Sequence, residues 1–205
     1  MRRRDFVSIS AASFALSAAS HSWAERLVPD KKLAGPTPKG DRIADAAAAQ
    51  YGVTTIYDPS YVRLAYPMGD VPIERGVCAD VVIRALRSCG HDLQAAIHQD
   101  MKAHFSAYPK TWGLKAPDKN IDHRRVLNLE TYLRRRGGVL AGGDASLRAG
   151  DFVTWRLPGN LPHIGVVATQ QTADRARPLI VHNVGAGVQI EDVLHAWPIV
   201  GRYRF

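Results

Sequence analysis

The apolar positions between residues 77 and 90 recur at helical spacing. They are Val77, Val81, Val82, Ala85 and Leu86. Gly90 then supplies a stop, so the pattern predicts a helix over this stretch. Similar patterns predict three more helices: residues 41–52, residues 92–105 with Asp92 as cap, and residues 122–137 with Asp122 as cap.

Short apolar runs separated by glycine, proline and asparagine replace the helical pattern after residue 145. These runs are "DFVTW", "HIGVVA", "PLIVHNV", "GVQI" and "VGRYRF". Their length and spacing predict antiparallel strands. Helices followed by strands predict an α+β domain, with N-terminal helices packed on one side of a C-terminal antiparallel sheet.

The first 24 residues have the pattern of a cleavable export signal, because an arginine cluster leads through an Ala/Ser-rich stretch to small residues. The order from Arg3 to Val7 resembles a twin-arginine signal, and an ordinary Sec signal is the alternative. The apolar run is shorter than the roughly 20 residues of a membrane-spanning helix, so no stable membrane insertion is expected after signal removal. We expect export to the periplasm or cell envelope, a flexible leader over residues 25–40, and one domain over 41–205.

The chain is basic, with 27 Lys and Arg against 19 Asp and Glu and a net charge of +8. A basic exported protein suits an anionic envelope polymer. Nucleic acid is not the expected partner, because we expect the chain to be exported and its basic residues lack aromatic interleaving. The sequence does not indicate whether the chain is a monomer or an oligomer.

The two cysteines are Cys78 and Cys89. On one continuous helix they lie about 16 Å apart along the axis, whereas a disulfide needs Cα atoms within about 7 Å. They therefore cannot bridge, and Cys89 is expected in the core. Cys78 begins the helix, where the free N–H groups and the dipole favour a thiolate and can hold an oxyanion.

Two histidines lie in the strand-like region, His163 in "HIGVVA" and His182 in "PLIVHNV". A hairpin with its turn near residues 173 and 174 pairs His163 with Val184 and Gly165 with His182, so both histidines share one face. A slip of one residue presents Asn183 instead. Each histidine is also readable as an ordinary polar residue on a half-exposed strand.

A cysteine followed by these residues gives a Cys-His-His or Cys-His-Asn order. In that order His163 takes the thiol proton of Cys78, and either His182 or Asn183 fixes the imidazole ring. No spacing typical of a metal site, a phosphate loop or a serine nucleophile elbow occurs, so we expect neither metal nor cofactor.

Three segments, "GVCADVVIRALRSCG", "LRAGDFVTWRLPGNLPHIGVVA" and "PLIVHNVGAGVQI", resemble in order the NlpC-type cell-wall cysteine peptidases of the papain-like superfamily. "YPMGDVPIERGVCADVVIRALR", "WGLKAPDKNIDHRRVLNLETYL" and "HIGVV" are similar to the bacterial family known as domain of unknown function 1287. The resemblance implies a papain-like fold, Cys78 as nucleophile, His163 as general base and His182 as orienting residue. It also implies that Tyr66 lies near the oxyanion, beside the Cys78 N–H.

Two features depart from the peptidase pattern. The usual Asp-Cys-Ser is replaced by Val77-Cys78-Ala79-Asp80, and residues 116–126 form an insert. Polar residues in these two places are candidates for lining a substrate cleft, although helix capping and surface charge explain them equally well. They are Asp80, Asp118, Asn120, His123 and Arg124.

These expectations combine into an exported cysteine amidase or endopeptidase that hydrolyses amide bonds, with peptidoglycan stem peptides as the leading substrate. Two alternatives remain open. One is a non-catalytic envelope-binding or scaffold protein that keeps the papain-like shape. The other is a transacylase that uses the same residues with a different acceptor.

Overall fold

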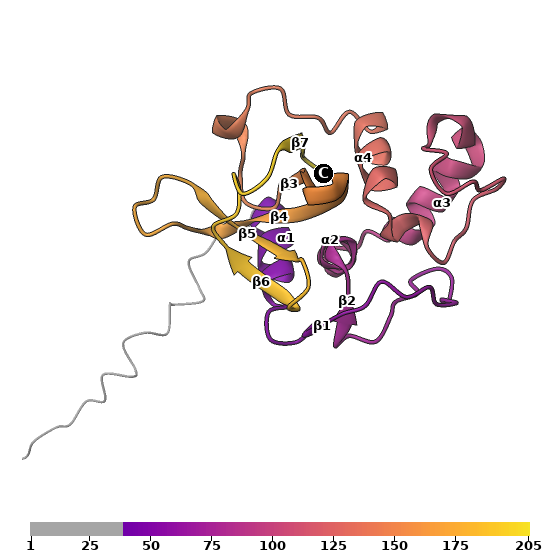
Figure 1. Ribbon diagram of the computed structural model, residues 1–205, viewed down its shortest axis with the longest axis horizontal. Helices are drawn as coiled ribbons and strands as arrows, with labels where there is room; N and C mark the ends of the chain where they lie inside the picture. The colour runs from indigo at the N-terminus through magenta and orange to yellow at the C-terminus, as the bar shows by residue number, and fades with distance from the viewer. Residues whose placement is uncertain (1–38) are drawn as a thin grey trace, which may run out of the picture. The chain divides into compact units, whose positions relative to one another are not determined.

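Five antiparallel strands form the main sheet, in the order β6-β5-β4-β3-β7 (Figure 1). The structure, a computed structural model, describes residues 39–205. The predicted signal and all but the last two residues of the predicted leader lie outside the described residues. The strands are β3 (Phe152–Leu157), β4 (Leu161–Gln171), β5 (Pro178–Asn183), β6 (Val188–Glu191) and β7 (Ile199–Tyr203). All five correspond to the runs predicted from the sequence.

The helices precede the sheet in the chain, as predicted. They are α1 (Lys39–Ala48), α2 (Cys78–Ser88), α3 (Leu93–His104) and α4 (Val126–Arg135). A small parallel pair, β1 (Ile56–Tyr57) with β2 (Arg75–Gly76), leads into α2. The predicted α+β class is confirmed.

The predicted cap of α3 is confirmed, but that of α4 is wrong. The Asp92 carboxylate accepts a hydrogen bond from the Gln94 N–H at 3.0 Å. Asp122 instead begins a short 3₁₀ turn, Asp122–Arg124, and α4 starts only at Val126. The Asp122 carboxylate cannot cap α4, because it accepts from the Asp118 N–H and from the Arg125 guanidinium.

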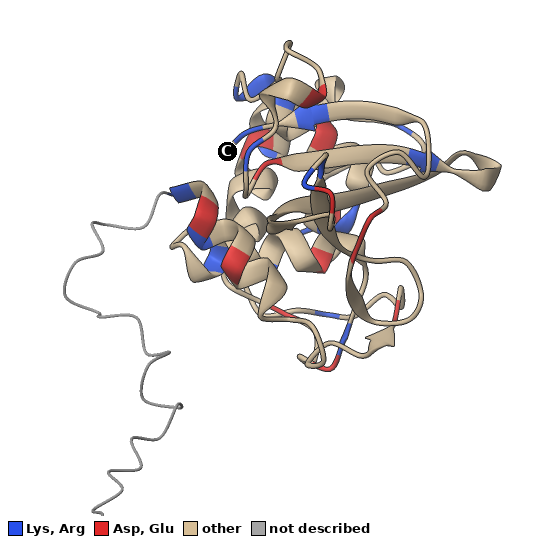
Figure 2. Cartoon of the chain, turned by 90° about the vertical axis from the view of Figure 1, so that its left-hand side faces the viewer, with Lys and Arg blue, Asp and Glu red and all other residues tan. Residues whose placement is uncertain are grey.

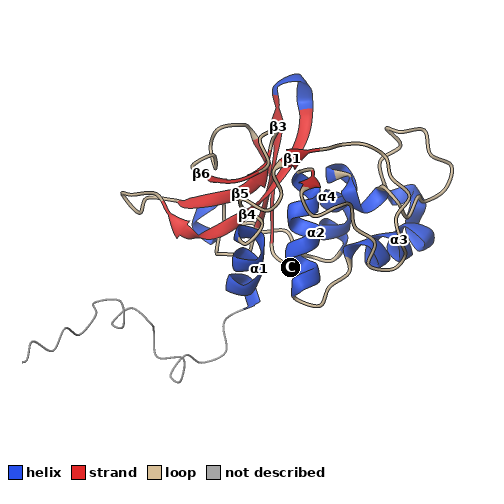
Figure 3. Ribbon diagram, turned by 90° about the horizontal axis from the view of Figure 1, so that it is seen from below, coloured by secondary structure: helices blue, strands red, loops and turns tan. Residues whose placement is uncertain are grey.

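The two faces of the sheet pack against different parts of the chain. Phe152, Ile164 and Val181 belong to the larger core, which includes residues of all four helices. Trp155 and Ile180 belong to a second core that residues between β6 and β7 complete. Figures 1 and 3 show the helices gathered on one side of the sheet. This segregation is what the order of helices and strands predicted.

The pairing of β4 with β5 has the register predicted near the histidines. Val166 lies opposite Val181, and Val167 lies opposite Ile180. Continued in the same register, the next pair is Gly165 with His182. Side chains alternate between faces along a strand, so His182 shares the face of Ile180, and Asn183 shares the face of Val181.

Charged residues of both signs are intermixed on the side of the domain that Figure 2 shows, rather than separated into a basic face. Among residues 39–205 there is no helix with the length and apolar character needed to cross a membrane.

Candidate active site

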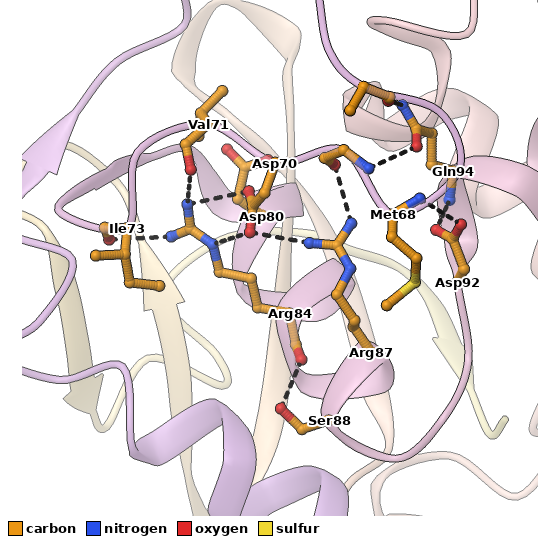
Figure 4. Close-up of polar contacts among 12 residues, drawn as sticks. Met68, Asp70, Val71, Ile73, Asp80, Arg84, Arg87, Ser88, Asp92 and Gln94 are labelled. Carbon is orange, nitrogen blue, oxygen red and sulfur yellow. Dashed lines mark hydrogen bonds and ion pairs between the residues drawn. The ribbon is translucent and has the colours of Figure 1, made fainter.

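The loop that leads to Cys78 is held by two arginines of α2 (Figure 4). The Arg84 guanidinium donates to both carboxylate oxygens of Asp70, at 3.0 and 3.2 Å. It also donates to four backbone carbonyls of the loop, those of Val71, Pro72, Ile73 and Arg75. Arg87 donates to Asp70 and to the Gly69 carbonyl. A buried guanidinium with this many acceptors fixes the path of the loop.

Asp80 stabilises the first turn of α2. Its carboxylate accepts from the Val77 N–H at 2.7 Å, and its own N–H donates to the Val77 carbonyl at 3.0 Å. Both carboxylate oxygens also accept from Arg124, at 2.9 Å each. The pair is almost fully buried, with 3% and 2% of the two side chains exposed. The departure from Asp-Cys-Ser thus places a buried, paired carboxylate two residues after Cys78.

Cys78 is the first residue of α2, and only 5% of its surface is exposed. Burial, with a smaller contribution from the nearby Asp80 carboxylate, raises the pKa of its thiol to about 11. The backbone N–H groups of Ile164, Ala79 and Cys78 face the sulfur and oppose this rise. The predicted lowering of the thiol pKa is therefore wrong, because burial outweighs the helix N-terminus.

The Ile164 N–H belongs to the residue that follows His163 in β4, so the sulfur packs against the strand beside that histidine. Nε2 of His163 lies 2.9 Å from Nδ1 of His182. Nε2 of His182 in turn lies 2.9 Å from Oε2 of Glu191. The structure therefore joins His163 to His182 by a hydrogen bond, and it packs the Cys78 sulfur against the backbone of the residue next to His163. The contribution of Glu191 was not expected from the sequence.

Both imidazole rings are buried among aromatic side chains. His163 has ring centroid distances of 5.8 Å to Trp155 and 5.6 Å to Trp197, and His182 lies 6.1 Å from Trp197. Burial, with a smaller contribution from the neighbouring His182, lowers the pKa of His163 to about 3. Burial also lowers the pKa of His182, against the opposing effect of Glu191. Both rings are therefore neutral at pH 7.

Asn183, the alternative third residue, lies on the other face of the sheet. Its side-chain amide donates to the Gly76 carbonyl at 3.1 Å, and no part of its side chain is exposed. The structure thus places His182, not Asn183, against His163. Gly165 makes room for this, since a Cβ there would lie 2.5 Å from Cγ2 of Ile180 and 3.3 Å from Cβ of His182.

A cavity of about 210 Å³ opens beside Cys78. Apolar side chains form most of its wall, and Arg124 is the one charged residue among those that line it. The lining residues are Tyr57, Pro59, Val77, Cys78, Trp112, Ile121, Arg124, Val126, Leu127 and Pro162. The bidentate contact with Asp80 neutralises the Arg124 charge, so the cavity suits an uncharged group.

The expected position of Tyr66 near the oxyanion is wrong. Its ring packs edge-on against His98, with centroids 5.1 Å apart, and lies outside the residues that line the cavity. Tyr57, in β1, lines the cavity instead, and its pKa is raised by burial and by the nearby Cys78. The family resemblance favoured Tyr66, twelve residues before Cys78, whereas Tyr57 precedes an Asp-Pro turn and carries no distinctive spacing.

Of the five residues predicted for a cleft, Arg124 alone lines this cavity. Asp80 is the partner of Arg124. The side chains of Asp118 and Asn120 bind each other and the Tyr61 hydroxyl, so they connect the insert to the loop before Cys78. His123 is buried, with its pKa lowered to about 4 by burial.

Both cysteines are free thiols, in agreement with the predicted absence of a bridge. Cys89 is half-buried against the main core rather than fully enclosed, because it lies at the C-terminal cap of α2. Among residues 39–205, no group of three or more His, Cys, Asp or Glu side chains has the arrangement of a metal site.

The family model for the domain of unknown function DUF1287 matches residues 44–205. The chain belongs to the DUF1287 family. Its match begins within α1 and continues to the end of the sheet. The uncharacterized protein YijF of Escherichia coli (strain K12) is 50% identical to this DUF1287 chain over 188 residues, which is 91% of each protein.

Two solved structures, NlpC1 and NlpC2 from Trichomonas vaginalis, are also similar to the DUF1287 chain. Each is 13% identical, and the TM-scores are 0.49 and 0.48. The alignments cover 83% and 84% of the DUF1287 chain. It spans slightly less than half of the two NlpC chains, 45% and 48%.

Proposed function

We propose that the DUF1287 domain is a cysteine hydrolase that cleaves amide bonds, with Cys78 as nucleophile and His163 as general base. One observation carries the proposal. The Cys78 sulfur, at the start of α2, faces the N–H of Ile164, which is the residue directly after His163. The His163 ring is in turn oriented by its hydrogen bond with His182. A nucleophile, a base and an orienting group in sequence is the arrangement that activates a thiol.

The raised thiol pKa and the lowered His163 pKa indicate a neutral resting pair, thiol and imidazole. Attack on a carbonyl carbon then forms the S–C bond while the thiol proton moves to His163, and the carbonyl electron pair moves to oxygen. The Cys78 N–H, which α2 leaves unpaired as its first donor, and the Tyr57 hydroxyl are the proposed donors to that oxyanion.

Collapse of this intermediate breaks the C–N bond, and His163 returns its proton to the leaving amine. The acyl group stays on sulfur as a thioester. His163 then takes a proton from water, whose oxygen attacks the thioester carbon, and the carboxylic acid leaves with the thiol restored. No step requires a metal or an organic cofactor.

Peptidoglycan stem peptides are the proposed substrate class. The sequence-predicted export signal and the basic net charge support an anionic envelope polymer. The apolar cavity beside the sulfur suits a small uncharged side chain next to the cleaved amide.

A second candidate is a non-catalytic scaffold that binds an envelope polymer, and the burial of Cys78 favours it. A peptidyl chloromethyl ketone with alanine before the reactive carbon separates the two. If the domain is a hydrolase, the chloromethyl ketone alkylates Cys78 faster than iodoacetamide does. In His163→Ala the two reagents should then react at similar rates. Slow alkylation by both reagents, unchanged in His163→Ala, contradicts the hydrolase and supports the scaffold. Peptide mapping by mass spectrometry distinguishes Cys78 from Cys89.

A further inference from the structure

The buried histidine pair ends at a carboxylate that the proposed mechanism leaves without a role. Glu191 is the last residue of β6, and its Oε2 lies 2.9 Å from Nε2 of His182. The Glu191 side chain is 47% exposed, whereas His182 is fully buried. Glu191, His182 and His163 therefore form a line of hydrogen bonds from solvent to the sheet beside Cys78.

Counting protons along this line shows which nitrogen of each ring carries the hydrogen. Both rings are neutral, so each carries one N–H. A carboxylate only accepts, and therefore the N–H of His182 is on Nε2, facing Glu191. Nδ1 of His182 is then a bare acceptor, so the N–H of His163 must be on Nε2. The bare nitrogen of His163 is consequently Nδ1.

We infer that Glu191 is a positioning residue that fixes the tautomers of both histidines and leaves Nδ1 of His163 as the base. This inference rests on the proposed function, because a thiol proton needs a bare nitrogen to receive it. Nδ1 is bonded to Cγ and so lies nearer the backbone of β4 than Nε2 does, and the sulfur packs against that backbone at the next residue, Ile164. Nε2 is on the far side and is occupied by His182.

Without Glu191, Nε2 of His182 faces water, which both donates and accepts. Either tautomer of His182 then satisfies its neighbours, and the proton of His163 is shared between its two nitrogens. A fraction of the molecules would carry the proton on Nδ1, where it blocks the transfer from Cys78.

The test compares four proteins labelled with ¹⁵N-histidine: wild type, Glu191→Ala, Glu191→Gln and Asp192→Ala. Two-bond ¹H–¹⁵N spectra at pH 7 report which ring nitrogen carries hydrogen. Gln retains an acceptor oxygen without the charge, and is therefore the conservative rescue. Asp192 is the matched control, because its carboxylate pairs with Arg177 and not with a histidine.

In wild type we expect Nε2–H and bare Nδ1 in both His163 and His182. In Glu191→Ala the Nδ1 and Nε2 shifts of both rings should move toward each other, while Glu191→Gln and Asp192→Ala keep the wild-type pattern. Peptide hydrolysis by Glu191→Ala should show kcat lower by about tenfold or more at nearly constant KM. A proton on Nδ1 of His163 in wild type, or unchanged spectra in Glu191→Ala, overturns the inference.

The spectra do not depend on turnover, so the hydrolase proposal and the positioning role of Glu191 are tested independently. If wild type shows the expected tautomers and loses them in Glu191→Ala but hydrolyses no peptide, the hydrolase proposal fails and the positioning role stands. If wild type hydrolyses peptides and the tautomers ignore Glu191, the hydrolase stands and the positioning role fails. Glu191 is half-exposed, and equal melting temperatures for all four proteins will confirm that each is folded.

Discussion

The Asn183 side chain donates to the Gly76 carbonyl at 3.1 Å, across 107 residues of sequence. This bond ties the end of β5 to the last residue of β2, two residues before Cys78, and it lies on the sheet face opposite His163. Asn183 therefore helps to place Cys78, while His182, on the other face, contacts His163, the proposed base.

Replacing Asn183 tests this division of roles. Asn183→Ala removes one of the two donors to the Gly76 carbonyl, which keeps the Asp58 N–H, so the free energy of unfolding should fall by about 1 kcal/mol. Urea unfolding measures the loss, and Gln189→Ala on the neighbouring strand β6 is the control, expected to stay within about 0.5 kcal/mol. Normal stability together with altered His163 ring nitrogens in Asn183→Ala would mean that Asn183, and not His182, orients the base.

The buried ion pair of Asp80 and Arg124 should be critical for stability. Asp80→Ala strands the Arg124 charge and removes the acceptor of the Val77 N–H, so we expect a loss of about 3–5 kcal/mol in urea unfolding. Asp192→Ala removes the exposed ion pair with Arg177 and should cost no more than about 1 kcal/mol. Equal costs for the two variants would show that the Asp80 pair is not what holds the start of α2.

The burial of Cys78 predicts an alkaline profile for its alkylation. With the thiol pKa at about 11, about one molecule in ten thousand carries a thiolate at pH 7. The iodoacetamide rate at Cys78, measured in Cys89→Ser, should rise tenfold per pH unit through pH 9. A plateau near pH 8 contradicts the burial and indicates a thiolate activated in the free protein.

The same pKa has a consequence for folding. The folded thiol holds its proton more tightly than the unfolded thiol does, so its contribution to stability is complete below about pH 9. That contribution is lost as the pH rises through about 11. Stability measured between pH 8 and 11 should therefore fall more steeply in wild type than in Cys78→Ser. Identical slopes would contradict the raised pKa.

Buried neutral histidines predict sensitivity to acid. The pKa values of His123, His163 and His182 are all lowered by burial, to about 4 and about 3 for the first two. Their stabilising contribution is complete above the unfolded pKa of about 6.5 and is lost as the pH falls toward the folded values. The free energy of unfolding should decline from pH 7 to pH 4, less steeply in His123→Phe. His104→Ala, at an exposed position, should keep the wild-type slope; equal slopes in all three proteins contradict this account.

The two tyrosines near Cys78 in sequence should differ in effect. Tyr57 lines the cavity and is the proposed oxyanion donor, so Tyr57→Phe should lower kcat by about 10²-fold. Tyr66 packs against His98, and Tyr66→Phe removes only its hydroxyl, so turnover should stay within about twofold of wild type. Hydrolysis assays of both variants measure this, and a larger loss in Tyr66→Phe would reverse the assignment.

The periodic parts of the fold could be predicted from the sequence because apolar spacing reports which side of an element is buried. From that spacing follow the start of α2, the five strands and the hairpin register that places His163 and His182 on one face of the sheet. Local spacing could not predict the path of the loops, because they have no repeating apolar pattern. The path of the chain before Cys78 depends on Arg84, which binds residues 9 to 30 positions away. Glu191 was missed because one exposed carboxylate at a strand end has no pattern of its own.

The predicted lowering of the Cys78 thiol pKa is wrong for a different reason. The helix N-terminus is visible in the sequence, but the burial that outweighs it depends on β4, β5 and the insert packing around Cys78. The sequence shows that Cys78 begins a helix, but only the packing shows the sign of its pKa shift.

Purified sacculi give the most direct test of the central claim. Wild type and Cys78→Ala are incubated with the same sacculi, and the released fragments are separated and weighed by mass spectrometry. The hydrolase account predicts fragments with a new amine and a new carboxylate from wild type and none from Cys78→Ala. Equal release by both proteins, or no release by either, would contradict it.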